Sequence, residues 1–126
     1  MTVVLDTNAL MMPVETDVRL FDEVERLLGE VEFVVPAAVV AELEKLAADG
    51  QGEAATAASV GRDLADRCTV RETGAAYADD AVVELAGSPS VTHAVTNDAP
   101  LAERLLDAGV SVLSLRGKNK LGITQP

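Results

Sequence analysis

The sequence predicts an α/β fold in which a parallel β-sheet is covered by helices on both faces. Short apolar runs alternate along the chain with longer segments of helical periodicity, which is the pattern of strands joined by crossover helices. The core is expected to be aliphatic, because 48% of the residues are hydrophobic and only 2% are aromatic. At 126 residues the chain is long enough for one domain with its own core.

The first third of the chain begins with a strand at residues 2–6, an unbroken apolar run of the kind found in sheets that are buried on both faces. A short helix follows, and it is expected to stop at Pro13. Residues 17–28 then carry apolar side chains at helical spacing, with Thr16 or Asp17 available as the N-cap.

The middle of the chain predicts a strand at residues 33–35 and then a helix, which Pro36 starts and Gly50 ends. An alanine-rich amphipathic helix is expected over residues 54–67. A short strand at residues 68–71 follows it.

The last third predicts a helix at residues 77–86, a strand at 91–96, a helix at 98–108 and a final strand at 110–115. Parallel strands joined by right-handed crossovers have all their carboxyl ends at one edge of the sheet. Side chains that directly follow different strands are therefore expected to lie close together.

Acidic residues occupy four notable positions relative to these elements. Asp6 ends the first strand, Glu42 lies within a helix, Asp80 opens a helix with Asp79 beside it, and Asp98 follows a late strand. Open α/β sheets bind ligands at the carboxyl edge of their strands. A buried carboxylate there is costly unless it is paired, and a metal ion is the obvious partner.

Each of these acids also has an ordinary structural interpretation. Asp98 can cap a helix, Asp79 and Asp80 can be first-turn acids favoured by the helix dipole, and Glu42 can belong to a solvated helix face. Asp6 is the hardest to explain in this way, because a carboxylate directly after a buried strand has few structural uses.

Four carboxylates that meet in one pocket repel one another and raise one another's pKa values. A divalent cation offsets this repulsion, and ligands that are all oxygen favour Mg²⁺ or Mn²⁺ over zinc. One cysteine and one histidine also cannot build the usual zinc site. Such a pocket suits phosphodiester cleavage, in which a metal polarises a phosphoryl oxygen and acidifies a bound water.

The net charge of −11 bears on the choice of partner, because an acidic protein repels nucleic acid at long range. Either the partner is not a nucleic acid, or the surface is adapted to high salt, as in a halophile, where screening is strong. Three lysines, a single isoleucine and abundant alanine, valine and acids favour the second interpretation.

The charge is also uneven along the chain, since no acid follows Asp107. Arg116, Lys118 and Lys120 fall in this acid-free segment and form a basic arm, which either contacts phosphate or is a solvated extension.

No apolar stretch approaches the length of a membrane span, and no signal peptide is expected before Asp6. The single cysteine, Cys68, is expected to be a small core residue. It excludes an internal disulfide framework and fits a reducing compartment, so a cytoplasmic location is expected.

Four short segments stand in a characteristic order: Leu5-Asp6-Thr7-Asn8, Val39-Val40-Ala41-Glu42-Leu43, Asp79-Asp80-Ala81-Val82-Val83 and Val95-Thr96-Asn97-Asp98. Together they resemble the motifs of the PIN-domain ribonucleases, over nearly the whole chain. The resemblance implies a three-layer α/β/α sandwich with a central parallel sheet of roughly five strands. This domain is expected at residues 1–116, followed by a basic C-terminal tail at 117–126.

The resemblance also implies an endoribonuclease that depends on Mg²⁺ or Mn²⁺ and cleaves single-stranded or structured RNA. The residues at the metal-binding, catalytic positions are Asp6, Glu42, Asp80 and Asp98. Asp80 fits this role better than Asp79, because the small-apolar-apolar run Ala81-Val82-Val83 follows it. The supporting polar positions are Asn8, Thr96 and Asn97. Many family members pair, so a homodimer is expected.

Two branches of the family stay open, a VapC-like toxin held by an antitoxin and a nuclease that processes ribosomal RNA. Thr96-Asn97-Asp98 and the ending at residues 112–118 look more like the second. A different class is a PIN-like module that binds RNA or protein without cutting, and the presence of all four acids argues against it. A phosphatase or response regulator is weaker still, because no Asp-x-Asp motif includes Asp6.

Overall fold

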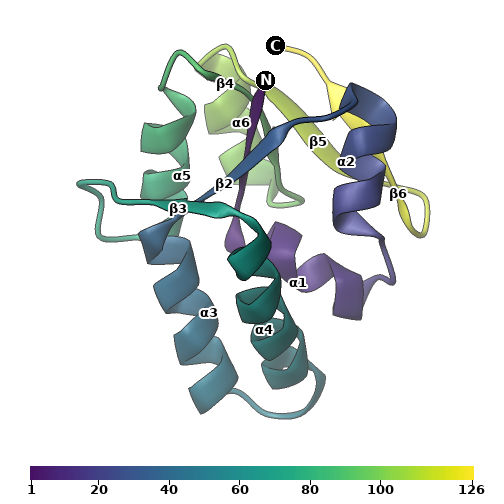
Figure 1. Ribbon diagram of the computed structural model, residues 1–126, viewed down its shortest axis with the longest axis vertical. Coiled ribbons are helices and arrows are strands. Elements are labelled where there is room, and N and C mark those ends of the chain that lie inside the picture. Colours follow the sequence, from purple (N-terminus) through teal and green to yellow (C-terminus); the bar gives the residue numbers. More distant parts are fainter.

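The central strand, β1 (Thr2–Leu5), is buried along its whole length, as expected for an apolar run covered on both faces. It pairs in parallel with β2 (Glu32–Pro36) on one side and with β4 (Val91–Val95) on the other. The computed structural model describes residues 1–126 and arranges helices around this sheet (Figure 1). The predicted α/β fold is confirmed, and its sheet is mainly parallel.

Three further strands complete the sheet, whose order is β3-β2-β1-β4-β5-β6. β3 (Thr69–Arg71) extends it in parallel beyond β2, and β5 (Ser111–Arg116) does so beyond β4. β6 (Lys120–Thr124) pairs antiparallel with β5 and is an addition to the roughly five parallel strands expected. The segment 117–126, expected to be a basic tail, therefore contains a strand of the sheet.

The helices of the fold are α1 (Thr7–Glu15), α2 (Leu20–Leu28), α3 (Ala37–Asp49), α4 (Gly52–Leu64), α5 (Ala78–Ala86) and α6 (Ala99–Asp107). A short 3-10 turn, η1 (Ala65–Arg67), follows α4. α4 packs against α1 and α3, whereas α5 packs against α6 and the strands β1, β2 and β4. In Figure 1 the α3–α4 pair projects beyond the edge of the sheet where β1 ends.

The expected stop at Pro13 is wrong, because α1 runs through this residue to Glu15. Proline removes one backbone donor, but only the last turn of the helix follows it, so little further helix is disturbed. Thr16 ends the helix, since its N–H and its hydroxyl both donate to the carbonyl of Met12, at 2.8 and 3.0 Å.

Asp17 reverses the chain between α1 and α2. Its φ of +61° is in the left-handed region, which aspartate tolerates better than most residues. α2 begins later than expected, at Leu20, and its N-cap is Arg19, which makes no side-chain capping bond. The predicted capping role of Thr16 or Asp17 is therefore wrong, because these two residues end α1 and turn the chain instead.

The order of the connections creates a switch point between β1 and β4. From β1 the chain steps outward through β2 to β3, then crosses back to β4 and continues outward to β5. The segments that leave the carboxyl ends of β1 and β4 therefore run to opposite sides of the sheet. Open α/β sheets bind ligands in the crevice that this arrangement leaves.

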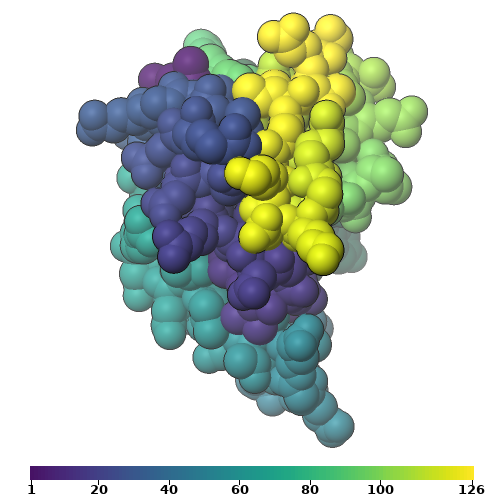
Figure 2. All heavy atoms as spheres, turned by 90° about the vertical axis from the view of Figure 1, so that its right-hand side faces the viewer, coloured from purple at the N-terminus to yellow at the C-terminus, as the bar shows by residue number.

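α2 seals the outer edge of β6. The carboxylate of Glu23 accepts the N–H of Leu121 at 2.9 Å, and Arg26 donates to the Leu121 carbonyl at 3.1 Å. The hydrogen bond from Arg26 is the main reason why the pKa of Glu23 falls to about 2. The β5–β6 hairpin is thereby held against α2, beside which it lies on the surface shown in Figure 2.

The core is aliphatic, as predicted, and Phe21 is its only aromatic member. Phe33 packs edge-on against Phe21, with 4.8 Å between the ring centroids. Cys68 is half-buried against this core, and burial raises the pKa of its thiol to about 11. No helix combines the length and the apolar character that crossing a membrane requires.

Candidate functional site

Asp6 lies at the junction of β1 and α1 and is almost fully buried, with 3% of its surface exposed. One carboxylate oxygen accepts the N–H of Ala9 at 2.6 Å and caps α1. The other oxygen accepts the hydroxyl of Thr96, which directly follows β4. This carboxylate therefore ties together the carboxyl ends of two neighbouring strands.

Burial raises the pKa of Asp6 from 3.8 to about 7. The hydrogen bonds from Thr96 and Ala9 oppose this rise, and the carboxylates of Asp79 and Asp98 add to it. A carboxylate in such surroundings is stabilised near neutral pH either by a proton or by a cation.

Thr96 links Asp6 to Asp98. Its hydroxyl donates to Asp6 and accepts the backbone N–H of Asp98 at 3.0 Å. Asp98 caps α6 through one carboxylate oxygen, which accepts the N–H of Leu101 at 2.9 Å. Its second oxygen makes no hydrogen bond to the protein, so the capping role leaves one oxygen of Asp98 free to bind a ligand.

Two asparagines fix the loop that follows β4. Asn97 donates its backbone N–H to the side-chain oxygen of Asn8 at 2.9 Å, and its own side-chain oxygen accepts the N–H of Leu115 at 2.7 Å. The second bond continues the β4–β5 pairing after the chain has left β4. Asn8, Thr96 and Asn97, the expected supporting residues, thus form connected contacts that position Asp98 relative to α1 and β5.

A cavity of about 310 Å³ opens at this edge of the sheet. Five carboxylates line it, and no lysine or arginine does: Asp6, Glu15, Glu42, Asp79 and Asp98. The other lining residues are Thr7, Asn8, Met11 and Asn97. They belong to α1, α3, α5 and the segments after β1 and β4, so the cavity lies at the switch point of the sheet.

Asp79 lines this cavity, whereas Asp80 does not. Successive helix residues point about 100° apart, and Asp80 pairs with Arg104 of α6 at 3.0 Å. Burial, followed by the carboxylates of Asp98 and Glu42, raises the pKa of Asp79. The geometry therefore favours Asp79 as the acid of α5 that takes part in the site, although the sequence favours Asp80.

Thr7 and Glu15 line the cavity without having been identified as candidates from the sequence. Together with Met11 they follow one face of α1 at intervals of four residues. This spacing is the sequence signal from which they could have been found. Thr7 is 9% exposed, and its buried hydroxyl has no hydrogen-bond partner. Since buried hydroxyls nearly always have partners, this group marks a position where a polar ligand fits.

The donor set of the cavity fits a hard divalent cation. Its charged groups are all carboxylates, and an oxygen of Asp98 and the hydroxyl of Thr7 are unpaired. No group of three or more acidic, histidine or cysteine side chains is close enough together to enclose an ion by itself. Mg²⁺ is compatible with this open arrangement, because it keeps several waters and is usually held by one or two carboxylates.

The three basic residues expected to contact RNA lie on the β5–β6 hairpin. Arg116 ends β5, where it packs over Gly122 and donates to the hydroxyl of Thr124 at 2.8 Å. Lys118 lies in the turn and Lys120 begins β6. Neither lysine forms an ion pair within the protein.

Comparison with solved structures finds several relatives of the whole fold, and three of them are described here. The PIN domain endonuclease Utp24 is 25% identical, with a TM-score of 0.79 over 99% of this chain and 92% of that chain. A domain of a functionally unknown protein from Methanocaldococcus jannaschii is 20% identical, with a TM-score of 0.67 over 94% of each chain. VapBC2 from Rickettsia felis, bound to a promoter DNA fragment, is 13% identical, with a TM-score of 0.67 over 92% and 100%.

Comparison with curated protein sequences gave no match. The family described as PIN like domain, in contrast, matches residues 3–118 and so includes every residue that lines the acidic cavity. The chain therefore belongs to the PIN-like domain family and is related in sequence and fold to a PIN endonuclease.

Proposed function

We propose that this protein is a metal-dependent endoribonuclease that cleaves phosphodiester bonds in single-stranded or structured RNA. The observation that carries the proposal is the convergence of five carboxylates, without any lysine or arginine, on one cavity between the ends of β1 and β4. Membership of the PIN-like family and the likeness to the endonuclease Utp24 support it.

The residues that would hold Mg²⁺ or Mn²⁺ are Asp6, Glu42, Asp79 and Asp98, with the sequence-based alternative Asp80 turned toward Arg104. When bound, the ion supplies polarisation of a phosphoryl oxygen and a more acidic water. Asp6 is held rigidly for this purpose by Ala9 and Thr96. Glu15, an exposed residue that also lines the cavity, is available to accept a proton from an attacking water.

Within the family we favour RNA processing, including that of ribosomal RNA, over a toxin role. Utp24 is more similar to this chain than the VapBC structures are, in both identity and TM-score. VapBC-1 from nontypeable Haemophilus influenzae is 19% identical, with a TM-score of 0.61. A toxin would require an antitoxin as a partner, and the family resemblance further implies a homodimer. The proposal includes a cytoplasmic location, a reducing compartment in which Cys68 stays a free thiol.

The acidic surface is compatible with RNA binding if the protein works at high salt. At about 1 M salt the Debye length falls to roughly 3 Å, so the net charge of −11 no longer repels RNA at a distance. Contacts between individual cations and phosphates then decide binding. We therefore propose a halophilic adaptation, in which the unpaired lysines of the β5–β6 hairpin contact the RNA backbone.

Substitution Asp6→Asn should abolish RNA cleavage, with a loss of more than about 100-fold, beyond that typical for outer-shell partners of a metal. It should also stabilise the metal-free protein at pH 8. The pKa of Asp6 is about 7 in the folded state against 3.8 ordinarily, so the stability of the wild type falls as pH rises from about 4 to 7. The difference between these two pKa values corresponds, above pH 7, to a free energy of unfolding that is higher for the variant by something on the order of 4 kcal/mol.

Thermal unfolding of both proteins with EDTA, from pH 4 to 8, measures this effect. The two stability curves should diverge as pH rises and stay apart above pH 7. If Asp6→Asn instead melts earlier than the wild type with and without Mg²⁺, the carboxylate has only a structural role. Calorimetric Mn²⁺ binding that survives the substitution would favour a non-catalytic PIN-like module.

Substitution Thr7→Val should weaken Mn²⁺ binding by about 10- to 100-fold, the range typical for groups that support a metal. The metal-free protein should be no less stable, because the Thr7 hydroxyl has no partner to lose. Titration calorimetry and thermal unfolding measure the two quantities. Thr56→Val is the matched control, since the exposed Thr56 hydroxyl bonds the Gly52 carbonyl of its own helix. Equal metal affinity in all three proteins would exclude Thr7 from the site.

Substitution Asp79→Asn should reduce cleavage at least about 100-fold, whereas Asp80→Asn should change it only a few-fold. Asp79 faces the acidic cavity, and Asp80 forms a half-exposed ion pair with Arg104. Single-turnover cleavage of a labelled RNA under saturating Mg²⁺ measures both variants. The reverse ranking would restore Asp80 as the metal ligand.

Removing the two unpaired hairpin lysines, by Lys118→Ala and Lys120→Ala together, should weaken RNA binding for all sequences alike. The slope of log affinity against log salt should fall by about 0.7 for each lost contact with single-stranded RNA. Fluorescence anisotropy over a salt series measures the slope. Lys45→Ala, which removes another unpaired lysine on α3, is the control and should leave it unchanged. An unchanged slope in the double variant would show that the hairpin is merely solvated.

A further inference from the structure

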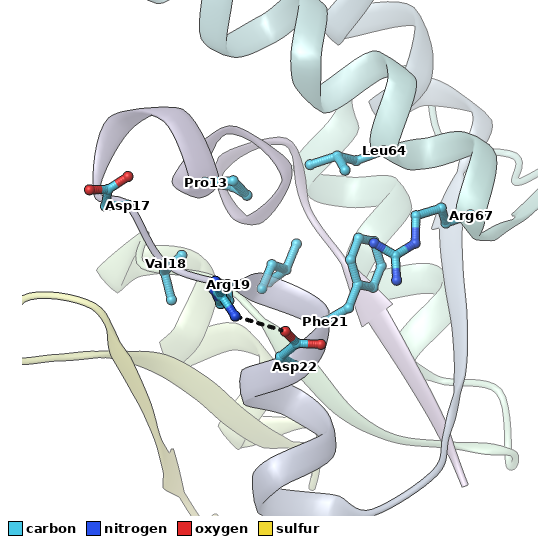
Figure 3. Close-up of a pocket in the computed structure, with 9 residues that line it drawn as sticks. Pro13, Asp17, Val18, Arg19, Phe21, Asp22, Leu64 and Arg67 are labelled. Carbon is cyan, nitrogen blue, oxygen red and sulfur yellow. Dashed lines mark ion pairs between the residues drawn. The ribbon is translucent and has the colours of Figure 1, made fainter.

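A second cavity, of about 370 Å³, opens between the end of α1, the start of α2 and the end of α4 (Figure 3). It is lined by apolar groups such as Pro13 and Leu64, and also by two arginines, Arg19 and Arg67. Two aspartates are part of the lining as well, so its charges balance, unlike those of the acidic cavity. Its volume is within the range of small-molecule sites, and its mixed lining suits a neutral, planar, polar-edged group.

Arg67 provides a flat surface in this cavity. Its guanidinium lies over the ring of Phe21, 4.0 Å from the centroid, as Figure 3 shows. Phe21 is itself held edge-on against Phe33. Arg67 forms no ion pair and no side-chain hydrogen bond, so the ring fixes its plane while its N–H donors stay free. Unstacked RNA bases bind on such guanidinium planes and aromatic faces.

Arg19 also lines this cavity, on the segment that leads into α2, and is available for a phosphate. Its contact with Asp22 is 4.0 Å long, and both side chains are largely exposed, at 86% and 69%. An exposed pair of this kind contributes little stability, so a nucleotide phosphate can replace Asp22 as the partner of Arg19 at little cost.

A third, smaller cavity connects this site to the basic hairpin. It shares Asp17 and Arg19 with the second cavity, which is called the Arg67 cavity from here on. It is also lined by Asn119 and Lys120. Its remaining acid, Glu23, is already engaged by Arg26 and the Leu121 N–H. The two cavities thus adjoin at Asp17 and Arg19, and together they are called the groove below, from Lys120 past Arg19 to Arg67.

The groove lies next to the acidic cavity. Glu15 lines the acidic cavity and Asp17 lines the groove, and two residues of chain span at most about 7 Å. The last turn of α1 is therefore the divider between them, with Glu15 on one side and Pro13 on the other. An RNA strand that crosses this turn can occupy both cavities at once.

We propose that the Arg67 cavity binds one unstacked base of the RNA strand whose backbone is cleaved in the acidic cavity. The base stacks on the Arg67 guanidinium over Phe21, and the neighbouring phosphates contact Arg19 and Lys120. This subsite rests on the proposed nuclease function and adds to it a base contact outside the metal site.

The test uses short labelled single-stranded RNAs in which each nucleotide in turn lacks its base. Binding to the full-length protein is measured by anisotropy in EDTA, so that no cleavage occurs. For the wild type, removal of the base at one position should weaken binding by about 5- to 100-fold, the range for one stacked base. Arg67→Ala should lose a similar factor on intact RNA and become insensitive to the base at that position.

Two further variants separate stacking from charge. Arg67→Lys keeps the charge but removes the flat guanidinium, so it should behave like Arg67→Ala. Arg71→Ala is the matched control, because Arg71 is paired with Glu32 on β2 at 2.8 Å and lies outside the groove. It should keep both the affinity and the sensitivity to the missing base. Arg67 is exposed, so its substitutions should leave the fold intact, which circular dichroism can check.

The contrary outcomes differ for the two proposals. If the wild type cleaves RNA but every base-deleted RNA binds as tightly as intact RNA, the base subsite is wrong and the nuclease stands. If Arg67→Lys binds RNA as tightly as the wild type, Arg67 contacts only a phosphate, and the proposed stacking is wrong. Free nucleoside monophosphates that bind through Arg67, without any effect of base deletion in RNA, would assign the cavity to a small nucleotide. A wild type that neither binds nor cleaves RNA when Mg²⁺ is present would overturn both proposals.

Discussion

The buried carboxylate of Asp6 is the interaction on which the rest of this structure depends. One oxygen starts α1 by accepting the Ala9 N–H, and the other accepts the hydroxyl of Thr96 after β4. These two bonds hold the segments that follow two neighbouring strands in a fixed relation, although ninety residues separate them in sequence. They also oppose, without cancelling, the penalty of burying a charge, so the pKa of Asp6 stays near 7. The site thus contains a charge that the protein orients but does not neutralise, which is the condition for binding a cation.

This constraint explains how chemistry and binding are divided over the surface. A cavity with five carboxylates cannot attract a phosphate chain by itself, and the chain has few cations to spare, since five of its ten basic side chains are in ion pairs or near contacts with acids. Of the others, Lys118 and Lys120 lie on the β5–β6 hairpin and Arg67 lies at the groove. Glu23 and Arg26 on α2 hold that hairpin in place by bonding the backbone of Leu121. The ion pair between Glu23 and Arg26 therefore holds in place a hairpin whose two lysines have no acidic partner.

Much of the fold and part of the site could be predicted from the sequence, because strand runs and the residues that follow them are local signals. Asp6 and Asp98 were identified in this way, and the cavity brings them together. The choice between Asp79 and Asp80 depends on one step of about 100° around α5, which a local pattern with uncertain helix boundaries does not resolve. β6 contains Gly122 and has no unbroken apolar run, so it is recognisable only beside β5, whose backbone groups it pairs. The unpaired hydroxyl of Thr7 is a tertiary property, since what surrounds it comes from other parts of the chain.

The same reasoning explains why α1 is more than a connection between strands. Its N-cap is Asp6. One side of the helix lines the acidic cavity with Thr7, Met11 and Glu15, and Pro13 lines the groove. The left-handed turn at Asp17 then brings Arg19 back toward the groove. A longer helix would carry this arginine away from the acidic cavity, at about 1.5 Å for each added residue. The end of α1, made by Thr16 and Asp17, therefore leaves Arg19 in the groove, beside an acidic cavity that this arginine does not line.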